Sequence, residues 1–238
     1  MRTKKLLLTA IVLFAISIGA IAQFPIEIKK ILDPATGGLS EKDAVAGIRE
    51  ALVKGTGESV KIVSKVNGYF ANPEIKIPFP QEAKDVETKL RAIGLGSQVD
   101  EVVTSINRAA EDAAKSAEPV FVSAINGMSI ADAINIVKGN NDAATRYLEK
   151  TTSPELRSKF SPIIKASLDK VDATRLWAEV IKQYNQIPFV KKQNPDLTAY
   201  VTDKAIAGLF VMVAKEEAKI RHDPAARATE LLKKVFGN

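Results

Sequence analysis

The sequence predicts an all-α protein: a single multi-helix domain built around a buried hydrophobic helix near the C-terminus. The first observation is that residues 205–214 contain no polar side chain, and a helix that is apolar on every face is surrounded by protein or by lipid. These ten residues rise about 15 Å, half of a bilayer core, so we expect protein around them. The second is that apolar residues recur at helical spacing along most of the chain. The third is that three segments open with Ser and Asp at capping-box spacing: Ser40 and Asp43, Ser97 and Asp100, and Ser129 and Asp132.

The first 22 residues have the features of a secretory signal peptide. Three basic residues among the first five precede an almost entirely apolar run over residues 6–18, and Ala20-Ile21-Ala22 supplies the small-x-small pattern that signal peptidase reads. We expect cleavage after Ala22 and a periplasmic or secreted protein; an uncleaved N-terminal anchor is the alternative. Residues 23–38 are then an N-terminal leader segment, and residues 39–238 are the all-helical domain.

Composition excludes several classes of site. The chain has no cysteine, which rules out disulfides, thiol catalysis, cysteine-ligated metal and a lipoprotein anchor. Its formal charge of +6 falls to about +3 when the three basic residues of the signal are removed. Because the remaining basic residues are dispersed and aromatic residues are few, we expect no nucleic-acid partner. We also expect no transmembrane segment after signal cleavage.

The helical pattern predicts about eight helices. Gly55 and Gly57 weaken the middle of the first, Pro119 is expected to kink the third, and Ser153-Pro154 is expected to begin a new helix. Asn140 or Asn141 is the expected cap of the short helix before Ser153. The segments run over residues 40–66, 81–93, 97–125, 129–138, 141–148, 153–184, 197–221 and 224–236, and Asp172 is an alternative new cap within the sixth.

Residues 69–80 resist a helical interpretation. Pro73, Pro78 and Pro80 break helices, while apolar and other residues alternate between Ile75 and Phe79. This pattern predicts one short extended, proline-rich segment or a short edge strand.

Catalytic motifs are mostly missing. The one histidine, His222, precedes an Asp-Pro pair and is expected at the surface or at a cap; the chain has neither a Gly-x-Ser-x-Gly elbow nor a phosphate loop. Adjacent glutamates and aspartates diverge on a helix, so the pairs at 111–112 and 216–217 do not converge on one substrate. We expect Glu111–Lys115 and Glu217–Arg221 to be exposed ion pairs. No catalytic residue, cofactor or metal is predicted.

Two polar clusters interrupt the apolar framework and are the candidate ligand- or partner-binding sites. One lies in the alanine-rich segment after residue 97, and the other surrounds two short helices, where helix N-termini present donors that can hold an anion. The alternative interpretation is a set of caps and a buried polar network that fixes the order of the helices. The candidate residues are Asn107, Arg108, Glu111, Asp132, Asp142, Thr145 and Arg146.

Several blocks of the sequence resemble the DUF4197 family, a group of uncharacterised bacterial proteins. The blocks are Leu39–Ala44, Asn107–Glu111, Met128–Ala133, Asp142–Tyr147, Ile220–Arg227 and Leu231–Gly237. The resemblance implies an exported helical domain, typical of Gram-negative bacteria, with no assigned activity. Some relatives resemble lipoproteins, and the missing cysteine departs from that pattern.

Three functional hypotheses follow. The first is a non-enzymatic binding or structural protein of the cell envelope, with an unknown protein or small-molecule partner at the polar clusters. The second is a carrier of an apolar, lipid-like ligand, with a cavity between the alanine-rich helix and residues 205–214. The third is a hydrolase built on carboxylates, for which neither a nucleophile–base pair nor a metal set is visible.

Overall fold

The structure is a computed structural model of the 238-residue chain. It describes residues 41–80, 84–92, 94, 96–186, 188–189, 192, 194 and 196–223. The predicted signal peptide, the leader segment and the helix expected over residues 224–236 lie outside the described residues.

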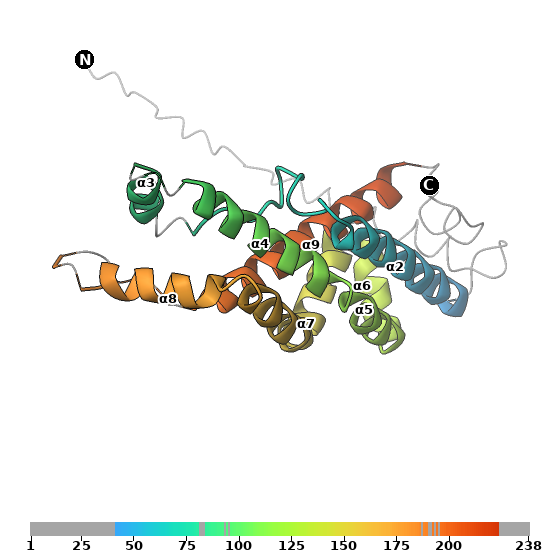
Figure 1. The fold of residues 1–238 in the computed structure, drawn as a ribbon. Helices are drawn as coiled ribbons and strands as arrows, with labels where there is room; N and C mark the ends of the chain where they lie inside the picture. Colours follow the sequence, from blue (N-terminus) through green and yellow to red (C-terminus); the bar gives the residue numbers. More distant parts are fainter. Residues whose placement is uncertain are drawn as a thin grey trace, which may run out of the picture. The chain divides into compact units, whose positions relative to one another are not determined.

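The described residues are mainly helical and contain no strand, which confirms the predicted all-α class (Figure 1). One hydrophobic core draws buried residues from most of these helices. The helices are α2 (Glu41–Ser64), α3 (Lys84–Ala92), α4 (Gly96–Ala114), α5 (Ala117–Asn126), α6 (Ile130–Lys138), α7 (Ala143–Asp169), α8 (Ala173–Tyr184) and α9 (Leu197–His222).

Helix α9 is the predicted central helix, and it packs against α7, α2 and α4. By length and composition it would suffice to cross a membrane, but 56% of its most apolar window is buried in protein. Phe210 meets the ring of Phe121 from α5 edge to face, with ring centroids 5.9 Å apart. Only Ala207 and Val211 of residues 205–214 are exposed, so protein surrounds the helix on most of its sides.

Helix α7 corrects two predictions. The expected break at Ser153-Pro154 is wrong, because one 27-residue helix runs through Pro154 and Pro162. Proline removes the backbone donor to the carbonyl four residues earlier, which for Pro154 is the carbonyl of Lys150. The hydroxyls of Thr152 and Ser153 donate to the two carbonyls before it, those of Leu148 and Glu149. Buried apolar residues on both sides of the prolines hold the two halves in the same core. The helix begins after Asp142, so the expected cap at Asn140 or Asn141 is also wrong.

Two other helix boundaries test the capping pattern. The box predicted at Ser129 and Asp132 is confirmed, with both reciprocal hydrogen bonds present at the start of α6. The box predicted at Ser97 and Asp100 is wrong: α4 begins at Gly96, and Asp100 binds Arg91 of α3 instead.

The sequence predicted a kink at Pro119 within one helix. The structure instead has two helices, which are separated four residues before the proline. Helix α4 ends at Ala114 and α5 begins at Ala117, so Pro119 lies in the first turn of α5. A proline ring clashes with the carbonyl of the residue four positions before it, which here is Lys115, and the break therefore falls in front of the proline.

The extended segment follows a tight turn at the end of α2. Asn67 adopts the left-handed conformation, with φ of 69°. A Cβ atom at Gly68 would lie 2.6 Å from the carbonyl oxygen of Ile62, so the turn requires glycine there. Residues 69–75 form turns and residues 76–80 are extended, as predicted, and no residue of this segment belongs to a strand.

Two helical glycines give opposite expectations for substitution by alanine. At Gly208 of α9, a Cβ atom would lie 2.8 Å from Cε1 of Tyr69 and 3.1 Å from Cβ of Ile75. At Gly57 of α2, a Cβ atom would meet nothing within 4 Å. Overpacking costs about 1–3 kcal/mol, while alanine in place of glycine in a helix stabilises by about 0.5–1 kcal/mol.

We therefore predict that Gly208→Ala lowers the free energy of unfolding by roughly 1 kcal/mol and that Gly57→Ala raises it by about 0.5–1 kcal/mol. Urea denaturation followed by circular dichroism measures both. A Gly208→Ala protein as stable as Gly57→Ala would contradict the close packing of α9 against Tyr69.

Candidate functional site

The first predicted polar cluster holds the extended segment against α4. The Asn107 side chain is fully buried and accepts a hydrogen bond from the backbone N–H of Ile77 at 2.8 Å. Its amide nitrogen donates to the carbonyl of Ile77 at 2.8 Å and to that of Val103 at 2.7 Å. Asn107 thus pairs with both backbone groups of Ile77, as a neighbouring strand would.

Glu111, one turn further along α4, holds the start of the same segment. Its carboxylate is buried and accepts hydrogen bonds from the backbone N–H groups of Tyr69 and Phe70, each at 3.1 Å. Arg108 forms an ion pair with this carboxylate at 2.6 Å and donates to the side chain of Asn67 at 2.8 Å. The exposed Glu111–Lys115 pair predicted from the sequence is therefore wrong: Glu111 is buried, and Lys115 pairs with Asp112.

Tyr69 connects this cluster to the central helix. Its ring is fully buried, and its hydroxyl donates to the carbonyl of Ala205 in α9 at 2.6 Å. Burial, and then the charge of Glu111, raise the pKa of the Tyr69 phenol well above its usual range, so it remains a donor. The geometry favours the structural interpretation of Asn107, Arg108 and Glu111, and their role in binding a ligand stays a prediction.

We predict that Asn107→Ala lowers the free energy of unfolding by about 2–4 kcal/mol, because it leaves two buried backbone groups of Ile77 without partners, each worth about 1–3 kcal/mol. The control is Thr104→Ala on the same helix, whose hydroxyl bonds only to Asp100 within α4. The control should change stability by less than about 0.5 kcal/mol. Chemical denaturation of the two variants measures both effects. Equal losses of stability would contradict the role of Asn107 in holding the backbone of Ile77.

The second cluster is organised by Glu217 of α9, a residue absent from the predicted site. Its carboxylate accepts hydrogen bonds from the backbone N–H of Ala144 at 3.0 Å and from that of Thr145 at 2.8 Å. The hydroxyl of Thr145 also donates to it at 2.8 Å. These are the second and third residues of α7, whose N-cap, Asp142, makes no capping hydrogen bond of its own. The anion that the sequence analysis expected at a helix N-terminus is therefore a carboxylate of the same chain.

Arg221 completes this arrangement. It forms an ion pair with Glu217 at 2.8 Å, and its guanidinium also donates to the carbonyl of Ile136 in the last turn of α6 at 2.9 Å. The side chains of Arg221 and Glu217 are only 11% and 7% exposed, so the prediction of an exposed pair is wrong. One ion pair thus connects α9 to the start of α7 and the end of α6.

The remaining predicted residues do not join a common site. Asp132 serves the capping box of α6, and its hydrogen bonds from Ser129 hold the pKa of its carboxyl below the usual range. Asp142 and Arg146 form an exposed ion pair at 2.7 Å. Only Thr145 contacts Glu217. The signal that could have found Glu217 is its spacing of four from Val213 and three from Ile220, both buried.

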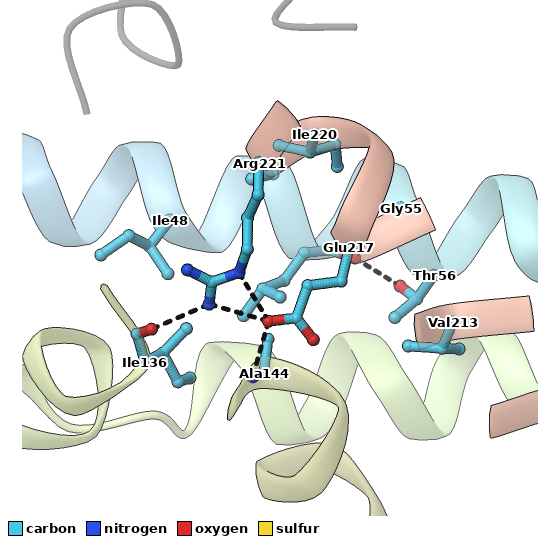
Figure 2. Close-up of a pocket in the computed structure, with 11 residues that line it drawn as sticks. Ile48, Gly55, Thr56, Ile136, Ala144, Val213, Glu217, Ile220 and Arg221 are labelled. Carbon is cyan, nitrogen blue, oxygen red and sulfur yellow. Dashed lines mark hydrogen bonds and ion pairs between the residues drawn. The ribbon is translucent and has the colours of Figure 1, made fainter. Parts of the chain in front are cut away.

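A pocket lies beside the Glu217–Arg221 pair, where α2, α6, α7 and α9 meet (Figure 2). The centres of water molecules can reach about 30 Å³ of it, which is room for more than one water and for a small aliphatic group. The carrier hypothesis placed its cavity instead between α4 and residues 205–214. The lining residues are Ile48, Ala51, Leu52, Gly55, Thr56, Ile136, Ala144, Val213, Glu217, Ile220 and Arg221.

The polar groups at this pocket are engaged within the protein. The hydroxyl of Thr56 donates to the carbonyl of Leu52 at 2.7 Å, and Glu217 and Arg221 bind each other. The side chains that remain to meet a ligand are aliphatic. Within the described part of the chain no group of three or more His, Cys, Asp or Glu residues is placed to hold a metal ion. His222 is exposed at the last position of α9.

We predict that Glu217→Ala lowers the free energy of unfolding by about 3–5 kcal/mol, because it removes the acceptor at the start of α7 and the buried carboxylate that pairs with Arg221. Asp203→Ala on the same helix is the control, since Asp203 pairs with Arg157 where both side chains are more than half exposed. Its effect should stay below about 1 kcal/mol. Thermal and urea unfolding measure the stability of the two variants. Similar losses of stability would contradict the role of Glu217 in connecting α9 to the start of α7.

The chain was compared with known proteins. A family model described as "Protein of unknown function (DUF4197)" matches residues 38–237. No curated protein and no solved structure matches the chain.

Proposed function

The chain belongs to the DUF4197 family, whose function is unknown. From the geometry of the chain we propose that it is a non-enzymatic binding protein of the cell envelope. Its binding site is the aliphatic pocket between α2, α6, α7 and α9. The single observation that carries this proposal is a pocket whose polar groups are engaged internally and whose aliphatic side chains remain to meet a ligand. Such a pocket gains affinity by burying an apolar group.

The two buried carboxylates argue for binding rather than catalysis. Glu111 and Glu217 each accept hydrogen bonds from two backbone N–H groups and face an arginine. A general acid or base must reach a proton of the substrate, and these oxygens are already engaged with the fold. The hydrolase hypothesis therefore has less support than binding.

The apolar-ligand hypothesis expected a cavity between α4 and residues 205–214, whereas this pocket lies between α2, α6, α7 and α9. Its size suits a short aliphatic group or the end of a longer chain, not a whole lipid. The occupant is then an aliphatic group of a small molecule or of a partner protein.

Two glycines of α2 supply a matched pair of test variants. A leucine at Gly55 would project into the pocket, where its Cβ would meet Ile220 at an ordinary contact distance of 3.4 Å. A leucine at Gly57 would project where nothing lies within 4 Å. Both substitutions replace a helical glycine, so their effects on helix propensity are equal.

We predict that octanol, an uncharged aliphatic probe, shifts the amide resonances of residues 48–56 and 213–221 in ¹H–¹⁵N spectra. Gly55→Leu should weaken this binding at least about tenfold, which corresponds to about 1.4 kcal/mol, while Gly57→Leu should leave it unchanged. Octanol shifts that are absent, or that persist equally in Gly55→Leu, would contradict the pocket as the binding site.

Export is the second part of the proposal and is supported by the basic, apolar and small-x-small regions of residues 1–22. Mass spectrometry of the protein from a Gram-negative host should give a mature chain that begins at Gln23 and is released with the periplasmic fraction. Ala20→Arg should block cleavage and leave the full-length chain at the membrane. A cytoplasmic, uncleaved wild-type chain would contradict export.

A further inference from the structure

Arg49 stands apart among the arginines. Seven arginines lie in the described part of the chain, and six of them, all except Arg49, form an ion pair with a carboxylate. Arg49 is half-buried; its Nη2 donates to the carbonyl of Met128 at 2.5 Å, and its Nε is buried without a partner. A half-buried guanidinium with a buried, unpartnered nitrogen and no carboxylate beside it gains from an anion.

The position of Arg49 relates it to the pocket. On α2 it is adjacent to Ile48 and three residues before Leu52, both of which line the pocket. Its partner Met128 immediately precedes the N-cap of α6, whereas the pocket residue Ile136 lies in the last turn of that helix. The length of α6 between these points is roughly 10 Å, which a medium-length aliphatic chain spans.

No carboxylate of the described residues forms an ion pair with Arg49, although Arg49 itself is not among the residues that line the pocket. The carboxylate of Asp132 lies in the same neighbourhood, since it and Arg49 both act on the pKa of Tyr147. It is committed to the backbone N–H of Ser129 and to the hydroxyl of the same residue, at 3.1 and 2.6 Å. The Met128 carbonyl bound to Arg49 is neutral, so a carboxylate from outside would be the first full negative charge on this guanidinium.

We infer that the ligand of this pocket is an aliphatic carboxylate of medium length, the end of whose chain fills the pocket and whose carboxylate binds Arg49. The inference rests on the proposed function, because it assigns a chemical class to the occupant of the same site. The aliphatic lining selects the chain, and the unpaired guanidinium selects the head group. The pocket thus binds the apolar end of the molecule, and Arg49 binds its carboxylate.

The test compares three probes of equal chain length: octanoate, octanol and octylammonium. Calorimetry and ¹H–¹⁵N titrations are carried out on the mature wild-type protein and on Arg49→Gln, Arg49→Lys and Gly55→Leu. Octanoate should bind the wild type about tenfold more tightly than octanol, because one charge-assisted hydrogen-bond pair contributes that much. Octylammonium should bind least.

The substitutions separate the head group from the chain. Arg49→Gln should reduce octanoate binding to the level of octanol and leave octanol binding unchanged, and the unchanged octanol binding shows that the pocket is intact. Arg49→Lys should restore part of the preference for octanoate. Gly55→Leu should weaken both probes.

The outcomes distinguish the inference from the proposed function. Equal binding of octanol and octanoate, lost in Gly55→Leu, would overturn the inference and leave the proposed function standing. A preference for octanoate that survives Arg49→Gln would also overturn the inference. No binding of any probe would overturn both.

Discussion

Backbone N–H groups that lie in the core without a helical partner need an acceptor there, and three side chains of this protein supply one. Asn107 and Glu111 meet the N–H groups of residues 69, 70 and 77, and Glu217 meets those of residues 144 and 145. An unpaired buried donor costs about 1–3 kcal/mol, a large share of the stability of a domain. The order of the helices depends on these contacts.

Helix α9 joins both arrangements. Its Ala205 carbonyl accepts the hydroxyl of Tyr69, and three turns later its Glu217 caps α7 while Arg221 binds the end of α6. Figure 1 shows α9 running behind α4 and α2, where its apolar faces meet the other helices. The consequence for function is that these polar groups inside the domain are engaged with the fold. What the domain offers a ligand is the aliphatic surface beside Glu217, with Arg49 near it.

Local patterns in the sequence predict the helices well. The apolar run near the C-terminus gave α9 within a residue of its bounds, because a helix that is apolar all round has few alternatives to burial. The prolines after Tyr69 correctly marked the segment that leaves the helical pattern. Pro154 led to a wrong prediction of a helix break, because buried apolar residues on both sides of it hold α7 in one core.

The site depends on contacts that no local pattern contains. Spacing of four shows that Glu217 and Arg221 share a face, but not whether that face meets water or the start of α7, which lies 72 residues earlier in the sequence. Asn107 and Glu111 were singled out correctly as unusual polar residues in an alanine-rich helix. Their partners are backbone groups 30 to 42 residues away, which side-chain patterns do not reveal. The same holds for Arg49, whose distinguishing feature is that no carboxylate among the described residues pairs with it.

Native-state hydrogen exchange of five amides tests most directly whether the buried polar side chains serve the fold. The amides are those of Tyr69, Phe70, Ile77, Ala144 and Thr145, which donate to Glu111, Asn107 and Glu217. The account predicts that they exchange only through global unfolding, as slowly as the amide of Leu209 in the centre of α9. Exchange of these five through local opening, orders of magnitude faster than Leu209, would contradict it.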